Sequence, residues 1–91
     1  MSKILIVDDN KNNRLFLNAL LDDFLEEHSQ FSFEISEAKN GKEAVDAASQ
    51  TSFDLILMDI SMPGIGGLEA TRKINQALPG VKIIAVTIHD D

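Results

Sequence analysis

Several residue types are missing from this chain of 91 residues. It has no cysteine, tryptophan or tyrosine, and its only aromatic residues are five phenylalanines. Without cysteine, neither a disulfide framework nor a thiolate metal site is possible, and both absences suit a protein of the reducing cytoplasm. The aromatic content also predicts no stacking platform for nucleotide bases. We therefore expect a cytoplasmic protein whose chemistry depends on oxygen and nitrogen groups.

Basic residues and long apolar runs are scarce as well. Eight lysines and arginines stand against fifteen acidic residues, for a formal net charge of −7, and the basic residues form no cluster. Direct binding of nucleic acid by this segment is therefore not expected. Every uninterrupted apolar run is far shorter than the roughly 20 residues that cross a bilayer. The sequence predicts neither a signal peptide nor a membrane segment.

The chain that remains has the composition of one small globular domain, with 44% hydrophobic and 25% charged residues. Short apolar runs alternate with amphipathic stretches along it. The runs predict strands at residues 3–7, 31–35, 53–58 and 81–86, and the amphipathic stretches predict helices at 13–27, after Asn40-Gly41, and from Leu68 to Pro79-Gly80. This alternation with short connections predicts a parallel sheet with right-handed crossovers and helices on both faces.

Three local patterns refine that expectation. Asn40, followed three residues later by Glu43, is typical of a helix N-cap with a reciprocal acid. Residues 31–35 alternate like a half-covered edge strand. The run 81–86 is nearly all apolar or β-branched, which predicts a strand covered on both faces.

Three carboxylates follow two of the predicted strands. Asp8 and Asp9 come directly after the first strand, and Asp59 ends the third. If both strands are parallel and adjacent, these side chains meet at the carboxyl edge of one sheet, where open α/β folds place their ligands. Carboxylates that crowd together repel one another and attract a hard cation, for which Mg²⁺ is the best candidate.

Such a site has a specific chemical capacity. A carboxylate beside Mg²⁺ can attack a phosphoryl group, and Thr87, at the end of the fourth predicted strand, could offer its hydroxyl to a phosphoryl oxygen. The product would be an acyl phosphate. Because this mixed anhydride hydrolyses readily, it suits a transient signal better than a stable modification.

Together these residues resemble a known family. The resemblance runs through the whole chain in order, and its motifs are Val7-Asp8-Asp9-Asn10, the segment Asp54 to Gly64 with its Met62-Pro63-Gly64 loop, Gly67-Leu68-Glu69, and Ile84-Ala85-Val86-Thr87. They are similar to the receiver domain of two-component response regulators. The resemblance implies a flavodoxin-like three-layer αβα fold of class α/β, with a parallel sheet in the order 2-1-3-4.

The family's roles map onto individual positions of this chain. The resemblance implies that Asp59 is the phosphoacceptor, which takes its phosphoryl group from the phosphohistidine of a histidine kinase or of a histidine phosphotransfer protein. It implies a Mg²⁺ site formed by Asp9 and Asp59, by Asp8 directly or through water, and by the backbone carbonyl of Ser61. Thr87 matches the switch hydroxyl. The domain would not be an enzyme beyond catalysing its own phosphorylation and dephosphorylation.

The sequence departs from the family after its fourth strand. Receivers usually continue with a fourth helix, a fifth strand ending in a lysine that pairs with the phosphoryl oxygens, and a fifth helix. We expect residues 1–91 to form a receiver domain that lacks these parts, so that its phosphate chemistry is impaired. An exposed fourth strand would also invite dimerisation or strand exchange.

The remainder of the parent protein has two possible forms. The segment Thr87 to Asp91 resembles receivers joined to helix-turn-helix output domains, which implies a DNA-binding parent. The opening Asp8-Asp9-Asn10 with Asn13-Arg14 is equally similar to receivers fused to hybrid histidine kinases.

Two other functions remain open at this point. One is a Mg²⁺-dependent phosphatase that uses an aspartyl phosphate; haloacid-dehalogenase-type enzymes, however, usually separate their two acids by one residue, and Asp8 and Asp9 are adjacent. The other is a non-catalytic scaffold, favoured by the missing lysine. In that case Asp8-Asp9 would only complement a helix dipole. The glycine-rich residues 64–67 lack the Lys-Ser/Thr ending of a nucleotide-binding P-loop.

Overall fold

The computed structural model describes residues 2–62 and 66–86. Four strands alternate with three helices along them, as the hydrophobic pattern predicts. In chain order the elements are β1 (Ser2–Val7), α1 (Lys11–Glu27), β2 (Phe33–Ala38), α2 (Gly41–Gln50), β3 (Leu55–Asp59), α3 (Gly67–Ala77) and β4 (Lys82–Val86).

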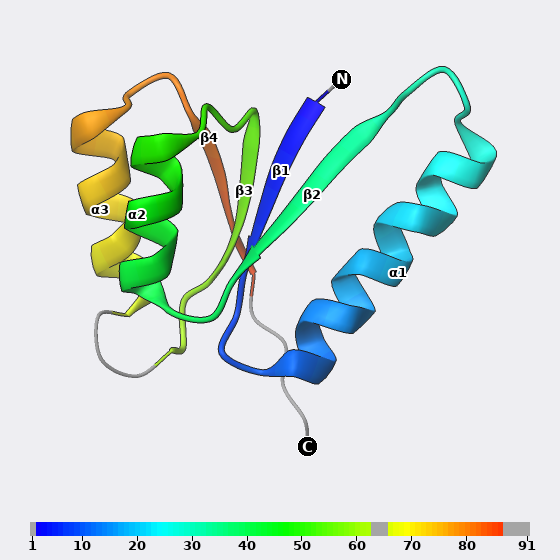
Figure 1. Cartoon of the computed structure of the whole chain (residues 1–91). Coiled ribbons are helices and arrows are strands. Elements are labelled where there is room, and N and C mark those ends of the chain that lie inside the picture. Colours follow the sequence, from blue (N-terminus) through cyan, green and yellow to red (C-terminus); the bar gives the residue numbers. More distant parts are fainter. Residues whose placement is uncertain (1, 63–65, 87–91) are drawn as a thin grey trace.

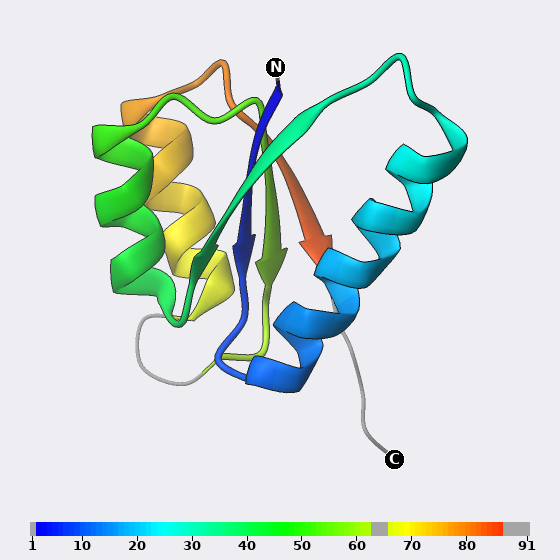
Figure 2. The same ribbon diagram turned by 45° about the vertical axis from the view of Figure 1, so that its right-hand side comes forward.

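The strands form one parallel sheet in the order β2-β1-β3-β4. Figure 1 shows α1 on one face of this sheet and α2 with α3 on the other, and the turned view in Figure 2 shows the same three layers. The flavodoxin-like αβα fold and the strand order implied by the family resemblance are therefore confirmed for the described residues.

β1 lies in the interior of the sheet, and its register with β3 is what positions the carboxylates. Ile4 pairs with Leu55 and Val7 pairs with Met58. At the start of the pairing, the Asp54 backbone N–H donates to the Lys3 carbonyl at 2.8 Å, and the Lys3 N–H donates to Asp54 Oδ2 at 2.7 Å. Since both strands run in the same direction, the residues that follow Val7 and Met58 lie at the same edge.

The main core lies between the sheet and the pair α2 and α3. Ala44 and Ala48 of α2 are buried, and their small side chains allow the helix to lie close to the sheet. Asn40 caps this helix, because its Oδ1 accepts a hydrogen bond from the Glu43 N–H at 2.8 Å. The predicted cap is confirmed, although the Glu43 carboxylate accepts from the Lys39 N–H and not from Asn40.

The predicted bounds of the second strand were wrong. β2 begins at Phe33, whereas the alternating pattern had placed the strand at 31–35. Phe31 belongs to the preceding turn, where its backbone N–H donates to the His28 carbonyl at 3.0 Å. Alternation of phenylalanine and serine therefore continued through a turn, and only the prediction of an edge strand was correct.

The predicted burial of the fourth strand was also wrong. β4 forms the other edge of the sheet, and Ile84 is 47% exposed. The reason lies in the layers: within the described part of the chain, α1 is the only helix on one face, and its Arg14 and Asn18 bond to Glu37 of β2, at the other edge of the sheet. Among residues 2–62 and 66–86, no helix is both long enough and apolar enough to cross a membrane.

Candidate functional site

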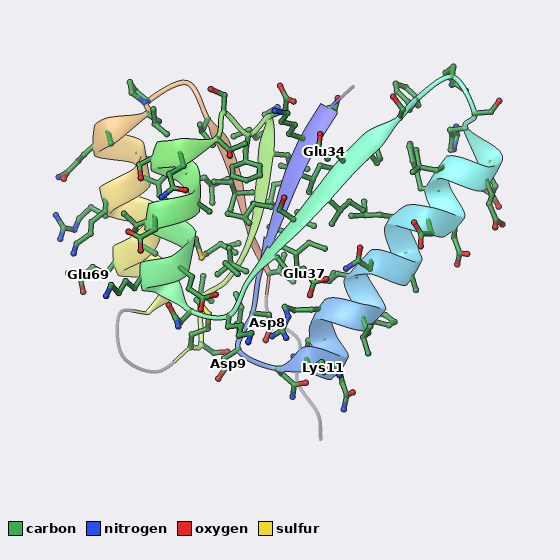
Figure 3. All side chains as sticks on the ribbon, in the orientation of Figure 1. Asp8, Asp9, Lys11, Glu34, Glu37 and Glu69 are labelled. Atoms are coloured by element: carbon green, nitrogen blue, oxygen red, sulfur yellow. The ribbon has the colours of Figure 1, made fainter. Side chains whose placement is uncertain are left out.

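Three carboxylates meet at the carboxyl edge of the sheet. Asp8 and Asp9 follow β1, Asp59 ends β3, and one carboxylate oxygen from each lies within 4.8 Å of the others. Figure 3 shows Asp8 and Asp9 at the point where β1 leads into α1. The convergence expected from the two strand ends is therefore present in the structure.

Without a cation, burial makes this cluster of carboxylates electrostatically unfavourable. Asp8 is 1% exposed and Asp59 is 5% exposed, whereas Asp9 is open to solvent. Burial raises the pKa of the Asp8 carboxyl above its ordinary value of 3.8, and the negative charges of Asp59 and Asp9 raise it further. Hydrogen bonds from the Asn10 backbone and the Asn13 side chain act in the opposite direction.

The Asp8 side chain is held by the turn that leads into α1. Its Oδ1 accepts a hydrogen bond from the Asn10 N–H at 2.9 Å. Asn10 in turn is the N-cap of α1, because its own Oδ1 accepts from the N–H groups of Asn12 at 2.8 Å and Asn13 at 3.3 Å. The same turn therefore starts the helix and orients the carboxylate.

Asp59 is held from two sides. Its Oδ1 accepts hydrogen bonds from the Ser61 N–H at 3.0 Å and from the Ser61 hydroxyl at 2.8 Å. Gly67, the first residue of α3, lies directly against the Asp59 backbone, and an added Cβ there would overlap it. Asp59 Oδ2 receives no hydrogen bond from the described residues, so it is the oxygen left for a ligand.

The donor set fits a hard divalent cation. All three groups are carboxylates, and neither of the two ion pairs found among residues 2–62 and 66–86 involves them. Clustered carboxylate oxygens without a basic partner are suited to Mg²⁺, which prefers oxygen ligands and retains part of its water shell. The residues present therefore fit the ion that the sequence predicts.

Other predicted site residues are placed only in part. Ser61 is next to Asp59, and the role of its carbonyl as a ligand stays a prediction. Thr87, Pro63 and Gly64 lie outside the described residues. Lys82 begins β4 at the end of the sheet away from the carboxylates, which places it far from the proposed phosphoacceptor.

Sequence reasoning missed a polar network beside the site. Arg14 is buried in α1, its Nη1 donates to the Asp8 carbonyl at 2.8 Å, and its Nε donates to Glu37 Oε1 at 2.8 Å. The Asn18 amide donates to Glu37 Oε2 at 3.1 Å. A signal was present in the sequence, because Arg14 stands three residues before Leu17, on the inward stripe of the helix.

A separate apolar pocket lies away from this site. It has a volume of about 270 Å³ and is bordered by the C-terminal half of α1 and the first residues of β1 and β3, including Leu21, Phe24 and Ile4. Its walls are mainly apolar, and it lies at the end of the sheet opposite the carboxylates. This apolar pocket and the carboxylate cluster are therefore separate parts of the molecule.

Comparison with known proteins finds similar chains. Residues 4–91 match the response regulator receiver domain. The response regulator UvrY of Escherichia coli is 41% identical over 91 residues, which is all of this chain and 39% of UvrY. GacA of Pseudomonas syringae is 38% identical over the same length, 40% of that protein. The chain thus spans about two fifths of these curated relatives.

Solved structures extend the likeness to three dimensions. The response regulator TrrA of Thermotoga maritima, in complex with Mg²⁺–BeF, is 38% identical, with a TM-score of 0.78 over 99% of this chain and 72% of TrrA. TrrA has also been solved in complex with the histidine kinase ThkA, with a TM-score of 0.76.

Proposed function

This chain belongs to the response regulator receiver domain family, and on that premise we propose that it accepts a phosphoryl group on Asp59 with the help of Mg²⁺. The observation that carries the proposal is the cluster of Asp8, Asp9 and Asp59 within 4.8 Å, at the ends of two adjacent parallel strands. Residues 1–91 would act as one receiver unit of a two-component or phosphorelay system.

The chemical step is a phosphoryl transfer to a carboxylate. Asp59 Oδ2 attacks the phosphorus of a phosphohistidine, a P–O bond forms, and the P–N bond breaks. The released imidazole nitrogen takes up a proton, and Asp59 becomes an acyl phosphate. The hydrogen bonds from Ser61 support this step, because they fix Oδ1 and leave Oδ2 directed toward the donor.

Mg²⁺ would be held by the carboxylates of Asp9 and Asp59, by Asp8 directly or through water, and by the Ser61 carbonyl. When bound, it neutralises negative charge on the transferring oxygens. The burial of Asp8 and Asp59 supports this assignment, since a cation would offset the repulsion between two desolvated carboxylates. Thr87 would supply a hydroxyl to a phosphoryl oxygen.

The role is regulatory, with no substrate turned over besides the domain's own phosphate. The phosphodonor would be a histidine kinase or a histidine phosphotransfer protein, and the complex of TrrA with a histidine kinase supports this class of partner. Self-association through the exposed edge of β4 is a second proposed contact, favoured by the exposure of Ile84. A cytoplasmic location would follow from such a partnership.

Acetyl phosphate labelling tests the proposal. The chain is incubated with Mg²⁺ and acetyl phosphate, and intact-mass spectrometry measures the added phosphoryl group on wild type and on Asp59→Asn. We expect labelling of wild type only. Asp54→Asn is the matched control, because Asp54 immediately precedes the same strand at its opposite end.

Equal labelling of wild type and Asp59→Asn, or no labelling of either, would contradict phosphoacceptance at Asp59. In that event Mg²⁺ binding without phosphorylation would favour the scaffold. Continuous release of phosphate from an added phosphomonoester would instead favour the phosphatase.

A further inference from the structure

Arg14 is the one charged side chain outside the carboxylate cluster that is buried in the described part of the chain. It lies in the first turn of α1, and its guanidinium bridges two elements. Nη1 donates to the Asp8 carbonyl at 2.8 Å, and Nε donates to Glu37 Oε1, on β2, at 2.8 Å. Figure 3 shows Glu37 on the side of β2 that faces α1.

Hydrogen bonds hold both backbone polar groups of Asp8. The Asp8 N–H donates to the Ala38 carbonyl at 3.1 Å, while the Asp8 carbonyl accepts from Arg14. Ala38 and Glu37 are adjacent residues at the end of β2. The backbone on which the buried Asp8 carboxylate is mounted is therefore anchored to the end of the neighbouring strand, once directly and once through Arg14.

The effect of Arg14 on the site is mainly geometric. Its positive charge is paired with the Glu37 carboxylate, and the Asn18 amide supports the other oxygen of Glu37. Little of that charge is left to neutralise the carboxylate cluster. The planar fork of an arginine, with donors in fixed directions, can hold a carbonyl and a carboxylate at once, whereas the single ammonium of a lysine cannot hold both in this geometry.

We propose that Arg14, braced by Glu37, is a positioning residue that sets the β1–α1 turn so that Asp8 and Asp9 can bind Mg²⁺. This inference rests on the proposed function, since it requires that the carboxylate cluster is a Mg²⁺ site. A residue outside the carboxylate cluster would then control the affinity of the site for Mg²⁺. Removal of the supporting contacts around metal ligands typically weakens affinity about 10- to 100-fold.

Mg²⁺ binding to the unphosphorylated chain is the test. Isothermal titration calorimetry gives the dissociation constant, and thermal unfolding is followed in EDTA and in saturating Mg²⁺. For Arg14→Met we expect a dissociation constant about tenfold weaker than that of wild type. We expect Arg14→Lys to fall between the two, and Glu37→Gln to lie near wild type, because glutamine keeps an acceptor for Nε and leaves the geometry intact.

The chain offers a matched control in Arg72, which pairs with Glu69 at 3.5 Å on the exposed surface of α3. Arg72→Met removes an arginine and an ion pair away from the site, and its Mg²⁺ affinity should equal that of wild type. A merely structural Arg14 would lower the melting temperature equally in EDTA and in Mg²⁺, and leave the dissociation constant unchanged. That result would overturn the proposal.

If Arg14→Met does not fold, Arg14→Lys decides by the same measurement: weaker binding supports the positioning role, and wild-type affinity refutes it. Failure of the underlying function is recognised separately. Wild type would then show no Mg²⁺ binding at all, which removes the metal site and the positioning role together. Wild-type binding with unchanged Arg14 variants removes the positioning role alone.

Discussion

Gly67 lies against the backbone of Asp59 so closely that no side chain fits between them. A Cβ at position 67 would lie 2.6 Å from the Ile60 Cα and closer still to the Asp59 carbonyl oxygen. Since both neighbours are backbone atoms, they cannot move aside as the end of a flexible side chain would. The first turn of α3 is thereby packed directly under the proposed phosphoacceptor.

Gly67→Ala should therefore disturb both stability and the site. We expect a loss of about 1–3 kcal/mol in the free energy of unfolding, as for other overpacked positions, together with slower labelling of Asp59 by acetyl phosphate. Urea unfolding and intact-mass spectrometry measure the two effects. Gly80→Ala is the control, because a Cβ at Gly80 meets no atom within 4 Å. Similar behaviour of the two variants would contradict the close packing at Gly67.

The raised pKa of Asp8 predicts a pH dependence of stability in the metal-free chain. Because the folded pKa lies above the unfolded one, the folded state binds more protons in the interval between them. The free energy of unfolding therefore decreases as the pH rises through that interval, and the penalty of an ionised buried Asp8 is complete above the folded pKa.

Asp8→Asn removes this contribution while keeping an oxygen that can accept from the Asn10 N–H. In EDTA, we expect the stability of wild type relative to Asp8→Asn to decrease from about pH 4 toward pH 7. Thermal unfolding across this range is the measurement, and Asp22→Asn, at an exposed position of α1, is the control. A wild-type to variant difference that is independent of pH would contradict the expected linkage.

Asn10 should contribute through its side chain as a helix cap. Its Oδ1 accepts from two N–H groups at the start of α1, so Asn10→Ala should cost about 1 kcal/mol of stability. Asn10→Asp retains the acceptor and should preserve stability. Chemical denaturation measures both, and Asn12→Ala, at an exposed position inside the same helix, should change little. A neutral Asn10→Ala would exclude the cap as a significant contribution.

The exposed edge of β4 should be responsible for any self-association. Ile84 is 47% exposed on an edge strand, a surface suited to pairing with another chain. Sedimentation velocity over a concentration series should show a smaller associated fraction for Ile84→Lys than for wild type. Leu68→Lys changes an equally apolar and more exposed residue of α3 and should leave association unchanged. The reverse order of effects would place the contact on α3.

The features predicted best were those that follow from strand periodicity. Apolar runs ending in Asp8 and Asp59 predicted buried strands, because a buried parallel strand tolerates almost no polar residue before its end. The carboxylates were expected to converge only if these two strands were parallel and adjacent. The strand order came from the family resemblance, since periodicity alone does not determine which strands are neighbours. Asn40 was predicted as a cap because capping depends on residues three positions apart.

The features missed depend on contacts that the pattern of apolar residues does not reveal. The start of β2 was misplaced because Phe31 fits a strand pattern, while its backbone closes a turn onto His28. No bonding role was predicted for Arg14, since its partners Asp8 and Glu37 are brought to it by the fold. The apolar run 81–86 alone predicted a covered strand, whereas the exposure of Ile84 agrees with the exposed fourth strand that the family resemblance implied.

The pairing of β1 with β3 also has a consequence for folding kinetics. The Lys3 and Asp54 backbones that open this pairing are 51 residues apart in sequence, so the chain must close a large loop before the pairing forms. In a partly folded chain in which only β1, α1 and β2 have formed, Asp8 and Asp9 are in position but Asp59 is not. The proposed metal site therefore comes into existence only with the docking of β3, and Mg²⁺ should slow unfolding more than it accelerates folding.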